Sequence, residues 1–206
     1  MTGQMGREDL LRQLEQLNIS DKVLGAVSKV DRENFVPESL RRRAYDNTAL
    51  PIGKGQTISQ PYTVAFMIDL LGLEKGDKVL EIGSGSGYNA AVMSKLIGTD
   101  GSIFSVERID YLVEYARKAL LAENVENVEV IEGDGRDGYI KESPYDRIIV
   151  TAAAEKVPEK LLDQLKEGQV MVIPLNKNGY QEMTRIVKQD PLKITRHGEF
   201  RFVKLV

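Results

Sequence analysis

The chain has 206 residues, 42% of them hydrophobic and 29% charged, a composition typical of soluble globular proteins rather than disordered or fibrous ones. Its 28 basic and 31 acidic residues give a net charge of −3, which provides no general attraction to nucleic acids or anionic membranes. With no cysteine and a single histidine, His197, the chain cannot form disulfides, Cys-ligated zinc, iron–sulfur or His-rich metal sites. A magnesium site made of carboxylates is not excluded.

The ends and apolar runs of the chain bear on where it works. The N-terminus, MTGQMGREDLLRQ, is polar and lacks the apolar core of a signal peptide. Asp69 interrupts the longest apolar run, residues 64–73, well short of the roughly 18 residues that a membrane span requires. We therefore expect a cytoplasmic protein that does not associate with membranes.

The first fifty residues are expected to form short helices. Leucines at positions 10, 11, 14 and 17 recur at helical spacing, and a second apolar stripe at 23, 24, 27 and 30 follows Ser20 and Asp21, which commonly begin helices. A third helix is expected to carry Arg41-Arg42-Arg43, a run more typical of a solvated helix end than of a nucleic-acid contact. Residues 50–66 then form a polar loop, in which Ser59 suits the cap of a helix beginning at Pro61.

From Lys75 onward, apolar strands alternate with helices. The expected strands are 78–82, 102–106, 128–131, 147–150 and 170–174, and the expected helices are 90–97, 109–120 and 158–165. This alternation predicts a mostly parallel, doubly wound α/β sheet with helices on both faces. Residues 183–187 and 200–205 alternate like strands and predict an antiparallel edge. We expect one domain over 1–206: a helical cap and loop (1–74), an α/β core (75–175) and a β-rich edge (176–206).

A glycine-rich turn follows the first core strand and reads Glu81-Ile82-Gly83-Ser84-Gly85-Ser86-Gly87-Tyr88. Glycines let the chain turn sharply and let a ligand approach the main chain, and the next helix offers free N–H groups. Tyr88 stands where the dinucleotide fingerprint requires its third glycine. An acidic residue followed by alternate glycines instead resembles the first motif of class I S-adenosyl-L-methionine (AdoMet) methyltransferases, and Glu81 would suit the cationic side of that ligand.

Two further acidic residues follow the next strands. Glu107 ends the second strand and is placed to accept hydrogen bonds from ribose hydroxyls. Asp134, after the third strand, is placed to accept from the adenine amino group, and Gly135 allows close backbone approach. A tight turn explains Asp134-Gly135 equally well by itself. The glycine loop by itself favours AdoMet over NAD, although a purely structural turn is also compatible with it, and the three acidic strand ends together strengthen the cofactor interpretation.

The segment PIGKGQTISQPY, residues 51–62, resembles the signature of protein-L-isoaspartate (D-aspartate) O-methyltransferases. The resemblance extends over almost the whole chain, through FVPE, LEIGSGSGY, SVERI, EGDGRDGY, SPYDRIIVTAAA and PEKLLDQLKEGQVMVIP. It implies a Rossmann-like AdoMet-dependent methyltransferase fold. It also implies methyl transfer from AdoMet to the free carboxylate of L-isoaspartyl residues in damaged proteins and peptides. The methyl ester leads to a succinimide and then partly to aspartate.

The same resemblance implies roles for individual residues. Ser59 falls on the active-site serine of the family, and Thr57 and Gln60 would touch cofactor or substrate. Glu107 would hold the ribose, Asp134 with Gly135 the adenine, and Gln181 lies near a glutamine that the family uses at the cofactor. The chain departs from the family at Lys54, at Lys204 and in lacking the histidines that follow the serine in animal members.

The chemistry agrees with this residue set. A peptide carboxylate has a pKa of about 4 and is already an anion at neutral pH, so its methylation needs no general base. Ser59 is then expected to orient the carboxylate by a hydrogen bond and not to act as a nucleophile. His197 is expected in a turn or at the surface. We expect a monomer without a nucleic-acid partner. The alternatives are a methyltransferase for small molecules or RNA, an NAD-linked oxidoreductase and a non-catalytic binding module.

Overall fold

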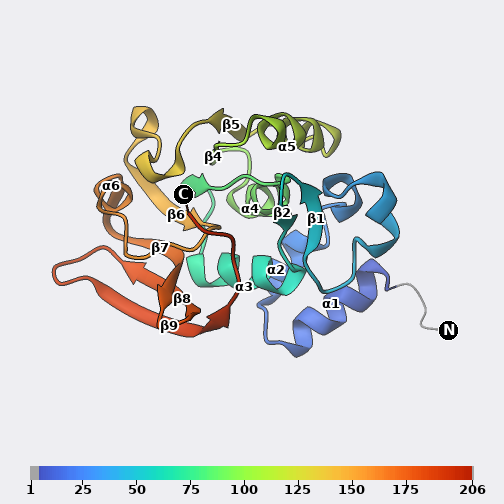
Figure 1. The fold of residues 1–206 in the computed structure, drawn as a ribbon, viewed down its shortest axis with the longest axis horizontal. Helices are drawn as coiled ribbons and strands as arrows, with labels where there is room; N and C mark the ends of the chain where they lie inside the picture. Colours follow the sequence, from blue (N-terminus) through green and yellow to red (C-terminus); the bar gives the residue numbers. More distant parts are fainter. Residues whose placement is uncertain (1–4, 206) are drawn as a thin grey trace.

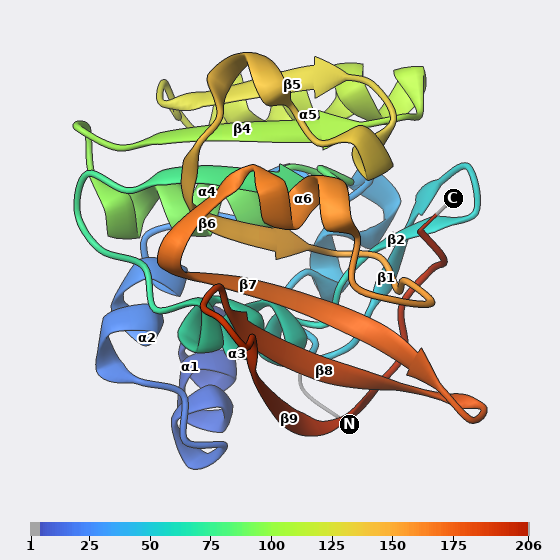
Figure 2. The same cartoon turned by 90° about the vertical axis from the view of Figure 1, so that its left-hand side faces the viewer.

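Seven strands form the central sheet, in the order β5-β4-β3-β6-β7-β8-β9 (Figure 2). The computed structural model describes residues 5–205. Residues 1–4 of the polar N-terminus and Val206 lie outside the described part. The first five strands in this order are parallel, and β8 and β9 add an antiparallel edge. The strands are β3 (Lys78–Ile82), β4 (Ser102–Glu107), β5 (Val128–Glu132), β6 (Tyr145–Val150), β7 (Leu165–Lys177), β8 (Tyr180–Val187) and β9 (Lys193–Phe200).

Helices cover both faces of the sheet, as the sequence predicts. Helices α3, α4 and α5 pack on one face, and the short α6 packs with β7 on the other. Helices α1 and α2 form an outer layer over α3 and α4, to the right of the sheet in Figure 1. The helices are α1 (Arg7–Gln16), α2 (Asp21–Val27), α3 (Pro61–Leu71), α4 (Tyr88–Ile97), α5 (Asp110–Ala122) and α6 (Glu159–Asp163), with short 3-10 turns η1 (Arg32–Phe35), η2 (Glu38–Arg43), η3 (Gly135–Asp137) and η4 (Ile140–Glu142).

Two hydrophobic cores lie on opposite sides of the sheet. Successive side chains of a strand point to opposite faces, so Val79 of β3 joins the core under α3–α5 and its neighbour Leu80 joins the core under α6. Both are fully buried. The near-continuous apolar runs of the core strands follow from this coverage of both faces.

The register of the strands brings four loops to one edge of the sheet. Ile82 at the end of β3 pairs with Val106 of β4 and Val150 of β6, and Glu107 pairs with Glu132 of β5. The loops that follow these strands therefore begin side by side. In open α/β sheets, ligands bind beyond the carboxyl ends of the strands, at this edge. The β1–β2 hairpin and the C-terminal segment also lie there, at the right in Figure 2.

The predicted helices and strands are present, with two corrections at the C-terminal side. Helix α6 is shorter than expected, because Leu165 already pairs with Tyr145 as the first residue of β7. The expected strand 200–205 is wrong: the final strand is β9, residues 193–200, so His197 lies in a strand and not in a turn. Residues 201–205 instead run along Ala153, which donates its N–H to the Val203 carbonyl and accepts from Leu205 N–H.

The expected polar loop at 50–66 contains a β-hairpin. Strands β1 (Leu50–Gly53) and β2 (Gln56–Ile58) are joined by Lys54 and Gly55, both with positive φ, as two-residue hairpin turns require. Pro61 begins α3 as predicted, but Ser59 is not its cap. Gln60 occupies that position without a side-chain bond, and the Tyr62 N–H is taken by Asn47 Oδ1 at 3.0 Å.

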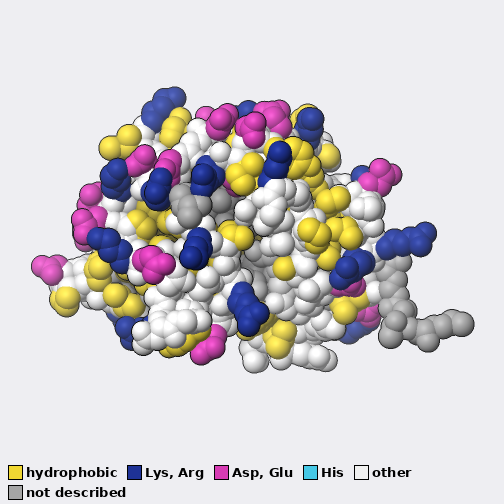
Figure 3. Space-filling model, viewed as in Figure 1, with side chains coloured by type: hydrophobic (Ala, Val, Ile, Leu, Met, Phe, Trp, Pro, Cys, Tyr) yellow, Lys and Arg dark blue, Asp and Glu magenta, His cyan; other side chains and the backbone are white. Residues whose placement is uncertain are grey.

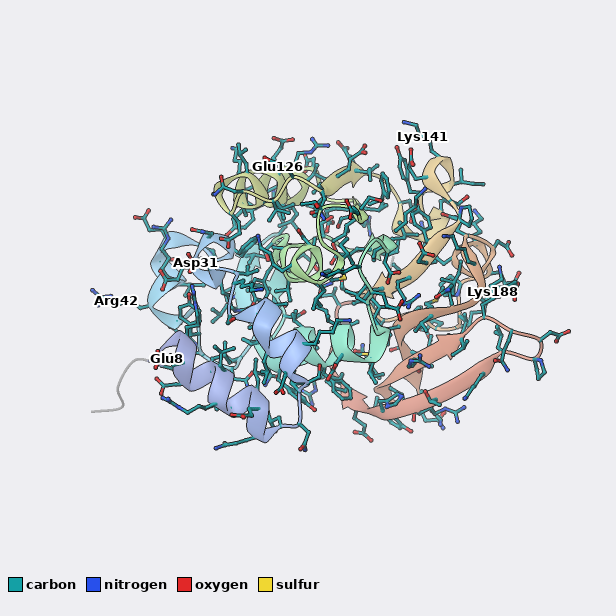
Figure 4. The ribbon with its side chains drawn as sticks, turned by 180° about the vertical axis from the view of Figure 1, so that it is seen from behind. Glu8, Asp31, Arg42, Glu126, Lys141 and Lys188 are labelled. Atoms are coloured by element: carbon teal, nitrogen blue, oxygen red, sulfur yellow. The ribbon has the colours of Figure 1, made fainter. Side chains whose placement is uncertain are left out.

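The charged surface is mixed in sign. Arg41, Arg42 and Arg43 are exposed at the end of η2, and Arg42 points away from the fold (Figure 4), so the run forms the solvated helix end that the sequence indicates. Acidic and basic side chains are interspersed on the face shown in Figure 3. Within residues 5–205, no helix is long and apolar enough to cross a membrane. The same residues contain no cluster of three or more His, Asp or Glu side chains arranged to hold a metal ion.

Candidate active site

A first cavity opens at the carboxyl ends of β3, β4 and β6. Its floor is the glycine loop that follows β3, and one wall is the end of β4 at Glu107. The C-terminal segment covers it through Val203, Lys204 and Leu205. The other lining residues include Gln56, Ile58, Met67, Ile82, Gly83, Ser84, Gly85, Ser86, Tyr88, Asn89, Arg108, Ile109, Leu112, Gly135 and Ala152.

A second, wider cavity of about 1010 Å³ adjoins the first. It lies between the start of α3, the β8–β9 edge and the C-terminal segment, and it includes Gln60, Gln181 and His197. Four residues line both cavities: Thr57, Ser59, Thr151 and Val203. Ser59 therefore stands where the two cavities meet.

The Ser59 hydroxyl is free to serve a ligand. No hydrogen bond to it is recorded within residues 5–205, and its backbone carbonyl accepts one from Arg32 at 2.7 Å. The N–H at the second position of α3, which a capping serine could have satisfied, is bound by Asn47 instead. Ser59 thus lies at the junction of the cavities, and its hydroxyl has no hydrogen-bond partner among the described residues.

Two glycines bring bare main chain to the wall of the first cavity. Gly83 has a φ of +94°, and a Cβ there would lie 2.3 Å from Thr151 Oγ1. A Cβ on Gly135 would lie 2.3 Å from Ile82 Cγ2. Both positions exclude a side chain because neighbouring protein atoms occupy the space that a Cβ would need.

Glu107 anchors the glycine loop and faces the first cavity. Its Oε1 accepts the N–H groups of Arg108 and Ile109, and its Oε2 accepts the Gly85 N–H at 3.0 Å. The side chain is nearly buried, yet it lines the cavity. A carboxylate oxygen has two acceptor sites, so Oε2 retains capacity for a hydroxyl donor of a ligand.

Glu81 lies behind the cavity wall instead of on it. Its carboxylate is fully buried, accepting from Asn89 Nδ2 at 2.6 Å and from the Ser105 hydroxyl. Burial raises the pKa of Glu81 to about 7, against the opposing effect of the Ser105 and Asn89 hydrogen bonds and with a contribution from Glu107. Asn89 lines the cavity, and its Oδ1 is a buried acceptor without a partner among the described residues.

The remaining predicted residues lie at different depths. Asp134 is half-exposed, and both of its carboxylate oxygens are bound by Arg136, whose hydrogen bonds hold the pKa of Asp134 at about 2. Its neighbour Gly135 is on the first cavity wall. Gln60 lines only the second cavity.

Gln181 also lines the second cavity, and it holds the C-terminal segment. Its Nε2 donates to the Phe202 carbonyl at 3.1 Å, and its Oε1 accepts the Phe202 N–H. His197 lines the same cavity, bonded to the Thr195 hydroxyl at 2.9 Å and packed against the Phe66 ring. Gln181 therefore lines the second cavity and not the first.

Known proteins resemble this chain in sequence and in fold. The model of the protein-L-isoaspartate(D-aspartate) O-methyltransferase family matches residues 5–206. The chain belongs to this family. A protein-L-isoaspartate O-methyltransferase of Ignicoccus hospitalis is 55% identical over 81% of this chain and 80% of its own length. A second, from Archaeoglobus fulgidus, is 49% identical over 97% of this chain and 92% of its own.

Two solved structures of the family superpose over nearly the whole chain. A protein-L-isoaspartate O-methyltransferase with 37% identity gives a TM-score of 0.87, covering 97% of this chain and 65% of that longer one. One from Plasmodium falciparum, solved with S-adenosyl-L-homocysteine, gives a TM-score of 0.87 at 25% identity, covering 98% of this chain and 99% of that one. The α/β AdoMet-methyltransferase fold predicted from the glycine loop is confirmed, and with it the family that the resemblance indicated.

The residues of the first cavity fit AdoMet chemically. A carboxylate with spare acceptor capacity at the end of β4 suits a ribose, and the unsatisfied Asn89 Oδ1 suits an ammonium donor. Sequence reasoning missed Asn89, although a single asparagine in the apolar helix sequence YNAAVMSKLI is a usable signal. It also missed Thr151 and the covering segment 203–205, which no local pattern places near the glycine loop.

Proposed function

We propose that this chain is a protein-repair enzyme that transfers a methyl group from AdoMet to the free carboxylate of L-isoaspartyl residues in proteins and peptides. The resulting methyl ester leads to a succinimide and then to aspartate. The observation that carries the proposal is the uncommitted Ser59 hydroxyl at the meeting point of the two cavities. One cavity suits AdoMet, and the wider one suits a peptide.

The reaction asks the protein to orient and desolvate its reactants. When bound, AdoMet supplies an electrophilic methyl on sulfur, which passes to a carboxylate oxygen as the carbon–sulfur bond breaks and leaves a neutral thioether. Ser59 donates a hydrogen bond to the substrate carboxylate and orients one of its oxygens toward the first cavity. Residues 203–205 limit the access of water. Such positioning accounts for up to about 7–11 kcal/mol of a reaction barrier, and a carboxylate nucleophile needs no general base.

The cofactor-binding roles form part of the same proposal. Glu107 accepts from the ribose hydroxyls, Asn89 Oδ1 accepts from the ammonium group, and Gly83 and Gly85 let the ligand approach the main chain. Gly135 lies against the adenine, and Asp134 accepts from its amino group once one oxygen is released by Arg136. Glu81 acts through Asn89, which it holds at 2.6 Å. We further propose that the enzyme works as a cytoplasmic monomer without a nucleic-acid partner.

A labelling experiment tests the function directly. Methyl-labelled AdoMet is incubated with the protein and a short isoaspartyl peptide, with the corresponding aspartyl peptide as the control. Base-labile label on the isoaspartyl peptide alone is the expected result. Thermal stabilisation by AdoMet without label transfer would preserve the cofactor site and refute the substrate assignment. Stabilisation by NAD instead would refute the cofactor as well.

Replacing Ser59 by alanine should lower kcat by about 10- to 100-fold, because one hydrogen bond to a charged group contributes roughly 1.5–3 kcal/mol. AdoMet affinity, measured by calorimetry, should stay within a factor of about two, since the predicted contact is to the substrate carboxylate. Ser143→Ala, which removes an exposed hydroxyl bonded to Ile140, is the matched control. Unchanged turnover in Ser59→Ala would remove this serine from the mechanism.

A further inference from the structure

Arg32 is the largest fully buried side chain of the described residues, and it joins three parts of the molecule. Its Nε donates to the Ala44 carbonyl at 2.8 Å, at the end of η2, and its Nη2 donates to the Ser59 carbonyl at 2.7 Å. The guanidinium carbon lies 4.5 Å from the centre of the Tyr88 ring. Tyr88 is the first residue of α4, directly after the glycine loop.

The charge of Arg32 is not matched by a carboxylate. Within residues 5–205 it takes part in no ion pair, and its Nη1 has no hydrogen-bond partner. Burial lowers the pKa of the guanidinium from its ordinary value, although arginine keeps its proton in proteins. A buried cation that only carbonyls and an aromatic face compensate is costly, and a neutral donor could satisfy the same carbonyls with a smaller desolvation penalty. Stability alone therefore does not account for a charged group here.

The charge of Arg32 strengthens its hydrogen bond to the Ser59 carbonyl. The Ser59 carbonyl precedes α3, whose own hydrogen bonds begin at the Gln60 carbonyl, so helix formation does not fix it. A charge-assisted hydrogen bond is roughly twice as strong as a neutral one and has a defined direction. Arg32 thus clamps the backbone of the residue that lines both cavities, and the same guanidinium rests on the first residue of the helix that follows the glycine loop.

We propose that Arg32 is a positioning residue for methyl transfer, which keeps the Ser59 hydroxyl in register with the methyl donor by locking the Ser59 backbone to the start of α4. The inference rests on the proposed function, because it acts through Ser59. It touches neither AdoMet nor the peptide: Arg32 lines neither cavity. Its loss should therefore slow the transfer step and leave ligand affinity unaltered.

Arg32→Lys tests this role, because an ammonium keeps the charge but cannot bridge two carbonyls as the rigid guanidinium does. The expected result is a kcat at least about 10-fold lower with the isoaspartyl peptide, while the AdoMet dissociation constant stays within a factor of about two. Arg32→Met, which keeps the volume and removes the charge, is the second variant and should show the same separation of kcat from AdoMet affinity. It also serves if the lysine variant does not fold.

Arg147 provides the matched control. It is also a buried arginine that donates to main-chain carbonyls, those of Leu71 and Gly72, each at 3.1 Å, but it lies toward the amino end of β6, away from both cavities. Arg147→Lys should lower the melting temperature without lowering kcat per folded molecule. Equal falls in kcat for both arginine variants would overturn the proposal, since they would show a general effect of disturbing a buried arginine.

A double-mutant cycle shows whether the effect passes through Ser59. In the Ser59→Ala background, Arg32→Lys should lower kcat by less than about twofold, because there is no hydroxyl left to misplace. A full, additive loss would overturn the proposal. No label transfer by the unaltered protein would overturn the proposed function together with this inference. Transfer by the unaltered protein with an undiminished kcat in Arg32→Lys would overturn the inference alone.

Discussion

Replacing Glu107 by alanine should weaken AdoMet binding by at least about 10-fold. The carboxylate would lose the one hydrogen bond to the ribose for which Oε2 has a free acceptor site, and such a bond contributes roughly 1.5–3 kcal/mol because the acceptor is charged. The substitution would also strand the N–H groups of Gly85, Arg108 and Ile109, which the carboxylate now accepts. The glycine loop would lose its link to β4, so affinity falls through both the ligand contact and the shape of the loop.

Calorimetric titration with AdoMet measures this effect, and two further variants separate its causes. Glu107→Gln keeps one acceptor oxygen and should give an intermediate loss. Glu132 lies opposite Glu107 in the register of β4 and β5, and its side chain is exposed. Glu132→Ala should leave AdoMet affinity unaltered. A folded Glu107→Ala protein that binds AdoMet as tightly as the unaltered protein would contradict the assignment of this residue to the cofactor.

Replacing Glu81 by glutamine should change how stability depends on pH. The pKa of Glu81 is about 7 in the folded protein against an ordinary value of 4.5. Between these values the unfolded chain releases the proton that the folded protein keeps, so the contribution of Glu81 is fully present below pH 4.5 and is lost as the pH rises through 7. The raised pKa corresponds to about 3 kcal/mol. Because glutamine cannot ionise, the Glu81→Gln protein should not lose this stability as the pH rises.

The measured quantity is the difference in unfolding free energy between Glu81→Gln and the unaltered protein, from urea titrations at about pH 4.5 and about pH 8. It should shift by about 3 kcal/mol in favour of the variant on going to the higher pH. Using a difference cancels the other titrating groups. Glu132→Gln, at an exposed position, is the control. A pH-independent difference for Glu81→Gln would show that this carboxyl group ionises as readily in the folded protein as in the unfolded chain.

Glu81 and Glu107 have different positions relative to the first cavity. Both end or nearly end neighbouring strands, yet Glu107 reaches the cavity and Glu81 supports it from behind through Asn89. Spacing along the chain cannot distinguish these positions, because successive residues of a strand alternate between faces and the loop that follows decides which side the ligand occupies. The sequence predicts that Glu81 contacts the ligand directly. In the structure Asn89 lines the cavity, and Glu81 holds Asn89 from behind.

Local sequence determined the core of this protein. The strands ending at Ile82, Glu107, Glu132 and Val150 were predictable within a residue or two, because their apolar runs are distinct and a glycine follows two of them, at positions 83 and 133. Helices α1, α2 and α5 followed from their apolar periodicity. The glycine loop and the QTIS segment indicated the cofactor and the family, since both resemble motifs of the family.

Tertiary structure alone decided what surrounds Ser59. Its capping role was a reasonable local reading, but Asn47 takes the helix N–H and Arg32 takes the carbonyl, both from segments distant in sequence. The edge strand β9 carries mostly polar, exposed residues and shows no apolar alternation, whereas the apolar residues after Phe200 line the cavities instead of extending the sheet. The periodicity of apolar residues indicates which face of one helix or strand is buried. The partners of Ser59 and the position of the C-terminal segment depend on contacts between different elements, so no local pattern predicts them.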